Sequence, residues 1–152
     1  YSIPVDSEQE YCCCNGKTRK LKNVFEKCDL KARYRVCTFK WSDLNILNEI
    51  LSLQKDDIST HVYIEVDMNG VWIKVDPTWD IGLKDILPVA EWDGRSDTVL
   101  AVSPIKVYSV EESERIMNQC SPENANEIRE YHANYFDIAF NKWLEDNRPV
   151  AR

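Results

Sequence analysis

Cysteine, histidine and aspartate occur in this sequence at positions where they could together carry out nucleophilic catalysis. A cysteine nucleophile needs a base that takes its proton and a third group that orients the base. Three adjacent cysteines occupy positions 12 to 14, and the only histidines are His61 and His132. His132 lies among polar residues and is predicted to be an ordinary surface side chain. His61 is therefore the candidate base, and Asp76 is the candidate orienting group.

Helical periodicity distinguishes the three cysteines. Apolar positions recur at steps of three and four, which predicts a helix with a buried stripe formed by Cys14, Thr18, Leu21, Val24, Phe25 and Cys28. The amino end of a helix favours a thiolate, and Cys14 starts this stripe. Cys13 would share a solvent face with Lys17 and Lys20, and Cys12 would precede the helix. Asp29, which tolerates the left-handed conformation, is expected to follow the helix.

A β-hairpin is predicted to bring His61 and Asp76 together. Residues 61–68 alternate in polarity, Asn69-Gly70 is typical of a type I′ turn, and residues 71–75 alternate again. In such a hairpin the start of the first arm lies opposite the end of the second. His61 is then either an ordinary strand-end residue or a cross-strand neighbour of Asp76, whose carboxylate would fix the imidazole tautomer.

The remaining patterns predict an α+β domain that spans residues 1–152, without linkers or repeats. Residues 33–41 favour a strand, and Ser42 is expected to cap a second helix with Leu44, Leu47, Ile50 and Leu51 on its apolar face. One or two strands are expected within 96–109 and a short helix over 111–119. A last long helix is expected to open at Ser121-Pro122-Glu123, with an apolar face of Ile128, Tyr131, Tyr135, Ile138 and Ala139.

Three blocks of the chain, in order, resemble the transglutaminase-like superfamily, a branch of the papain-like cysteine enzymes. They are a Cys-Asn-Gly-Lys-Thr helix start at 14–18 followed by Ala32-Arg33-Tyr34, the strand His61-Val62-Tyr63-Ile64-Glu65-Val66, and Trp72-Ile73-Lys74-Val75-Asp76-Pro77-Thr78. The similarity covers residues 12–80 and leaves 81–152 unexplained. Two positions depart from the family pattern, since Asp29 and Cys12 stand where the family often has glycine or another small residue.

The resemblance implies a papain-like fold, in which a nucleophile helix packs on an antiparallel sheet, here with a carboxy-terminal helical extension. Cys14 would be the nucleophile, His61 the base and Asp76 the orienting acid. The reaction would be acyl transfer on an amide through a thioester, most simply hydrolysis by a peptidase or amidase of a protein or peptide substrate. Protein-glutamine transamidation uses the same residues, and a non-catalytic interaction domain that keeps the fold is a further alternative.

Three further residues are candidates for the environment of the reaction. An oxyanion requires hydrogen-bond donors, and papain-like enzymes often place a glutamine before the nucleophile. Gln9 could serve in this way, or it could simply be exposed between two glutamates. Trp41 and Trp79 flank the segments that bear the site, and each is either a core residue or a wall of the substrate cleft.

Composition excludes several other classes of function. The net charge of −7 argues against binding to nucleic acid backbones, and no apolar run reaches the ~18 residues of a membrane-spanning helix.

Adjacent cysteines rarely chelate one zinc ion, so no metal site is expected, and no other cofactor is expected either. Cys12 or Cys13 could instead guard Cys14 by forming a disulfide. Mostly free thiols and a cytoplasmic location are predicted, although a chain that starts at Tyr1 is also compatible with a removed signal or a larger parent protein.

Overall fold

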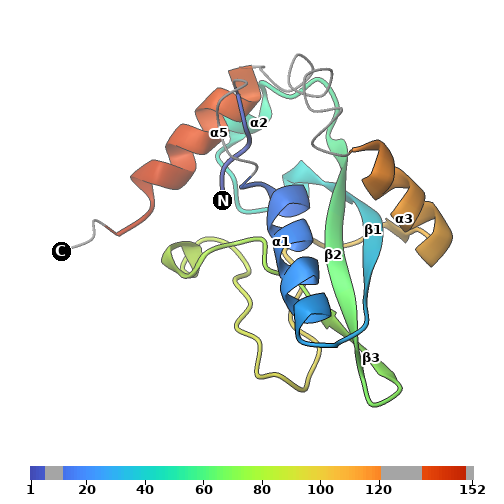
Figure 1. The fold of residues 1–152 in the computed structure, drawn as a ribbon. Coiled ribbons are helices and arrows are strands. Elements are labelled where there is room, and N and C mark those ends of the chain that lie inside the picture. Colours follow the sequence, from blue (N-terminus) through green and yellow to red (C-terminus); the bar gives the residue numbers. More distant parts are fainter. Residues whose placement is uncertain (6–11, 121–134, 150–152) are drawn as a thin grey trace.

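The computed structural model describes residues 1–5, 12–120 and 135–149, which form a mixed α+β structure (Figure 1). None of the helices in these ranges is long and apolar enough to cross a membrane. The regular elements are helix α1 (Cys14–Lys27), strand β1 (Ala32–Lys40), 3₁₀ helix η1 (Trp41–Asp43), helix α2 (Asn48–Leu51), strands β2 (Ile58–Met68) and β3 (Val71–Val75), 3₁₀ helix η2 (Ile81–Leu83), strand β4 (Lys106–Val107), and helices α3 (Val110–Gln119) and α5 (Tyr135–Asp146).

The strands form one antiparallel sheet in the order β3-β2-β1-β4. The hairpin between β2 and β3 turns at Asn69 and Gly70, whose φ angles of 59° and 88° are both left-handed. This geometry is that of a type I′ turn, which accounts for the Asn-Gly pair. The prediction of the hairpin and its turn is confirmed.

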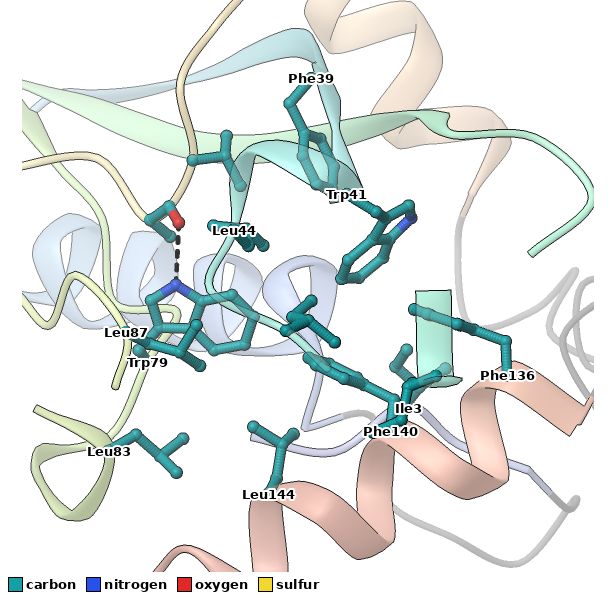
Figure 2. Close-up of a cluster of buried hydrophobic side chains, with 14 of the residues drawn as sticks. Ile3, Phe39, Trp41, Leu44, Trp79, Leu83, Leu87, Phe136, Phe140 and Leu144 are labelled. Carbon is teal, nitrogen blue, oxygen red and sulfur yellow. Dashed lines mark hydrogen bonds between the residues drawn. The ribbon is translucent and has the colours of Figure 1, made fainter. Parts of the chain in front are cut away.

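Both faces of the sheet are covered, so the middle of β2 is buried without alternation. One face carries Val36, Val62 and Ile64, which pack with Phe25 of α1 and Met117 of α3. The opposite face, with Cys37 and Tyr63, belongs to a larger apolar cluster. Figure 2 shows much of this cluster, including Phe39, Trp41, Trp79, Phe136, Phe140 and Leu144. Helices α1 and α3 thus cover one face, and α5 with the chain around Trp79 covers the other.

The predicted second helix is wrong in extent and in its cap. Ser42 lies inside η1, where its N–H and its hydroxyl donate to Asp57 at 2.8 and 2.6 Å, and α2 forms only over Asn48–Leu51. A carboxylate fifteen residues away thus takes the hydrogen bonds that a helix cap would have used. Between 96 and 109, only Lys106–Val107 forms a strand.

The apolar face predicted for the last helix is wrong at Tyr135 and Ile138, whereas Ala139 packs against the core as predicted. Tyr135 and Ile138 are 82% and 54% exposed, whereas Phe136, Phe140 and Leu144 are buried. The two phenylalanines stack on each other and pack on Trp41, so aromatic packing sets the rotation of the helix. Ile128, Tyr131 and the predicted start at Ser121 lie outside the described residues.

We expect Phe140→Ala to reduce the free energy of unfolding by about 3–5 kcal/mol, because Phe140 is fully buried and its removal leaves a cavity. Urea denaturation would measure the change. Ile138→Ala on the exposed side of the same helix is the control, with an expected effect within about 0.5 kcal/mol. Equal losses from the two substitutions would contradict the packing described for α5.

Candidate active site

Cys14 is the first residue of α1, as predicted. The preceding Cys13 is the N-cap, with extended backbone angles, and its carbonyl accepts from Lys17 N–H at 3.0 Å. The thiol of Cys14 lies 3.9 Å from Asn15 Oδ1, and its interaction with the His61 ring helps to raise the pKa of that ring. The sulfur therefore lies at a helix amino terminus and within range of the imidazole.

Cys13 is only partly exposed, whereas helical periodicity predicts a solvent-facing side chain. Burial, reinforced by the neighbouring Cys14, raises the pKa of its thiol to about 12, although the N–H groups of Gly16 and Asn15 act in the opposite direction. The helical wheel fails here because an N-cap residue has non-helical backbone angles. Cys13 is thus a neutral thiol at physiological pH and a poor nucleophile.

His61 is buried in β2, with 3% of its surface exposed, opposite Cys37 of β1. Its Nε2 donates to Asp76 Oδ2 at 2.8 Å, so the structure contains the contact predicted from the hairpin. The register pairs Ile64 with Val75, the last residue of β3. Asp76 therefore lies just beyond the ladder, and the imidazole reaches it diagonally rather than straight across.

The carboxylate of Asp76 is held by backbone groups on two sides. Oδ2 also accepts from Ala101 N–H at 2.8 Å, and Oδ1 accepts from Thr78 N–H at 3.1 Å. The N–H of Asp76 donates to Thr98 Oγ1 at 3.0 Å. Sequence analysis did not identify Ala101, because a main-chain donor can come from any residue except proline and so leaves no signal.

Burial and charge shift the pKa values of His61 and Asp76 in opposite directions. Burial lowers the pKa of His61, but the Asp76 charge, the hydrogen bond to Asp76 and the Cys14 sulfur outweigh it and raise the pKa to about 10. For Asp76, burial raises the pKa, but His61 and the backbone donors outweigh it and leave the pKa below its usual value. The pair is therefore an imidazolium and a carboxylate near neutral pH. Because Nε2 is engaged by Asp76, Nδ1 is the ring nitrogen left for the thiol.

Lys17 and Trp79 connect the elements that carry the site. Lys17 Nζ donates to Thr78 O at 2.8 Å, which ties α1 to the segment after Asp76. Trp79 Nε1 donates to Ala101 O at 2.9 Å, the dashed line in Figure 2, and so holds the residue whose N–H binds Asp76. Trp41 is buried in the same apolar cluster. Gln9, the candidate oxyanion donor, lies outside the described residues.

All six cysteines are free thiols. Within the ranges that the structure describes, no group of three or more histidine, cysteine, aspartate or glutamate side chains is placed to hold a metal ion. Comparisons with models of known protein families, with curated proteins and with solved structures found no significant match to this chain. The chemistry of the site is therefore argued from its own geometry.

We expect Asp76→Asn to lower the pKa of His61 from about 10 to below its ordinary value of 6.5. Loss of the anion removes the main interaction that favours the imidazolium, and burial then favours the neutral ring. Titration of the imidazole signals by NMR would measure both values, with His61→Gln used for assignment. An unchanged titration would contradict the electrostatic account of the pair.

Proposed function

We propose that the protein is a cysteine-dependent acyl-transfer enzyme that hydrolyses amide bonds through a thioester, as a peptidase or amidase. The observation that supports this most directly is one buried imidazole that is hydrogen-bonded to the Asp76 carboxylate at 2.8 Å and interacts with Cys14 at the start of α1. A sulfur, a base and an orienting acid are the three groups that cysteine-based acyl transfer needs. The resemblance of residues 12–80 to the transglutaminase-like superfamily, with its papain-like fold, points to the same roles.

In the first half of the proposed reaction, the Cys14 thiolate attacks the amide carbonyl carbon, and the carbonyl oxygen takes the negative charge. The oxyanion then collapses, the C–N bond breaks, and His61 gives its Nδ1 proton to the leaving amine. The products are a free amine and a thioester on Cys14. Asp76 stays ionised throughout, since its part is to hold the ring and stabilise the imidazolium.

In the second half, neutral His61 takes a proton from water, and the resulting hydroxide attacks the thioester carbonyl. The C–S bond breaks, which releases the carboxylic acid and returns Cys14 and His61 to the protonation states in which they began. An amine in place of water would give a new amide, which is the transamidation alternative. The N–H of Cys14, unpaired within the helix because it belongs to the first turn, is the natural donor to both oxyanions.

We expect His61→Gln to slow alkylation of Cys14 by iodoacetamide at about pH 6 by tenfold or more, because the imidazolium that favours the thiolate is lost. Peptide mapping by mass spectrometry would give the rate at each cysteine. Cys28, which is exposed, is the reference thiol in the same samples and should react at the same rate in both proteins. Equal rates at Cys14 in the two proteins would leave the proposed nucleophile without an activating base.

We expect amide turnover, once found by screening peptide and simple amide libraries, to fall by about 10³-fold or more in Cys14→Ala. Release of primary amine would measure turnover. Cys120→Ala, which alters a cysteine far along the chain, should keep the activity. Turnover that survives Cys14→Ala would exclude the thioester route, and new amide formed from added glycine methyl ester would indicate transamidation.

A further inference from the structure

Residues 1–3 lie beside the candidate active site and are held through their backbone and through the packed side chains of Tyr1 and Ile3. Tyr1 O accepts from Arg148 Nη2 at 2.7 Å, and Ser2 N–H donates to Cys12 O at 3.3 Å. Ile3 N–H donates to Asn141 Oδ1 at 2.8 Å, and Ile3 O accepts from Asn141 Nδ2 at 2.7 Å. The Tyr1 amino group also donates to Asp80 Oδ2 at 2.8 Å. Main-chain groups of all three residues thus take part in hydrogen bonds, as they do when a protein binds an extended peptide whose sequence is only partly specified.

The side chain of Tyr1 provides the specific contact. Its ring centroid lies 4.6 Å from that of Trp79 and 6.4 Å from that of Phe140. The phenol is buried, and burial together with the charges of Cys14 and Cys13 holds its pKa well above the usual range. An aromatic side chain thus already packs on Trp79 in a segment whose next residue, Ser2, bonds to the chain just before the proposed nucleophile.

The groups that hold the segment are positioned by other contacts. Arg148 is paired with Asp80 through Nε at 3.3 Å and Nη2 at 3.0 Å. Trp79 is fixed by its hydrogen bond to Ala101, and Phe140 lies in the buried cluster of Figure 2. Trp79, Phe140 and Arg148 thus have contacts that do not involve residues 1–3, whereas Asp80 is also paired with the Tyr1 amino group at 2.8 Å.

We propose that residues 1–3 hold the place of the substrate, so that an extended peptide with an aromatic residue binds against Trp79, Phe140 and Asn141 in their position. This inference rests on the proposed function and specifies its substrate class. The segment belongs to the same chain and competes with a free peptide at an effective concentration of the order of millimolar. A substitution that weakens the contacts of residues 1–3 should therefore allow a free peptide to bind more tightly.

The test uses N-acetyl-Tyr-Ser-Ile-amide as the probe and tryptophan fluorescence as the readout, because Trp79 contacts the ring. All proteins carry Cys14→Ser, so that binding is measured without turnover. Tyr1→Gly should bind the probe about tenfold or more tightly than the chain that keeps Tyr1, since the tethered ring no longer competes. Tyr135→Gly, which removes an exposed tyrosine, is the matched control and should bind like the chain that keeps Tyr1.

Ile3→Pro gives an independent test, because it removes the N–H that donates to Asn141 and leaves the proposed binding residues intact. It should also strengthen binding of the probe. If Tyr1→Gly does not fold, Ile3→Pro takes its place in the test. N-acetyl-Gly-Ser-Ile-amide should bind about tenfold or more weakly, because it lacks the ring. Absence of probe binding to folded Tyr1→Gly or Ile3→Pro would overturn the inference, as would equal binding of the glycine peptide. Either failure leaves the effect of His61 on Cys14 alkylation as a separate measure of the proposed function.

Discussion

The hydrogen bond between His61 Nε2 and Asp76 Oδ2 is the interaction on which the candidate site depends. Both groups are buried, and a buried ion pair is retained only if further hydrogen bonds offset the loss of water. Ala101 and Thr78 supply those bonds through their backbone N–H groups. The chain around Ala101 must therefore be in place for the pair to ionise, and the Trp79 indole, bonded to Ala101 O, helps to keep it there.

The same requirement explains why the sheet is covered on both faces. If the sheet were exposed to solvent, water would compete with Asp76 for the hydrogen bond to His61. The pKa of His61 would then be raised less. In this chain α1 and α3 cover one face, and α5 with the Trp79 region covers the other. Helix α1 also brings Cys14 to the imidazole, and Lys17 ties that helix to the segment that follows Asp76. Packing and chemistry are thus provided by the same elements.

The parts of the site that could be predicted are those encoded locally. The Asn-Gly turn sets the hairpin register, and that register brings His61 to Asp76; the apolar stripe after Cys14 sets the start of α1. The missed features depend on distant partners. Ser42 bonds to Asp57 instead of capping a helix, and the rotation of α5 follows the packing of Phe136 and Phe140 on Trp41. Ala101 contributes only its backbone, which no residue pattern reveals.

The thiols of Cys13 and Cys14 have different surroundings because the helix begins between these two residues. Cys13, with extended angles, turns its sulfur into a desolvated position where the thiol stays neutral. Cys14, with helical angles, directs its sulfur to His61. Reactivity in a run of cysteines is therefore decided by where the helix begins and not by the residue type. The buried ring of Tyr1 packs on Trp79, and the Trp79 indole holds the backbone of Ala101, whose N–H binds Asp76. Control of the site and recognition of its substrate would then depend on the same contacts.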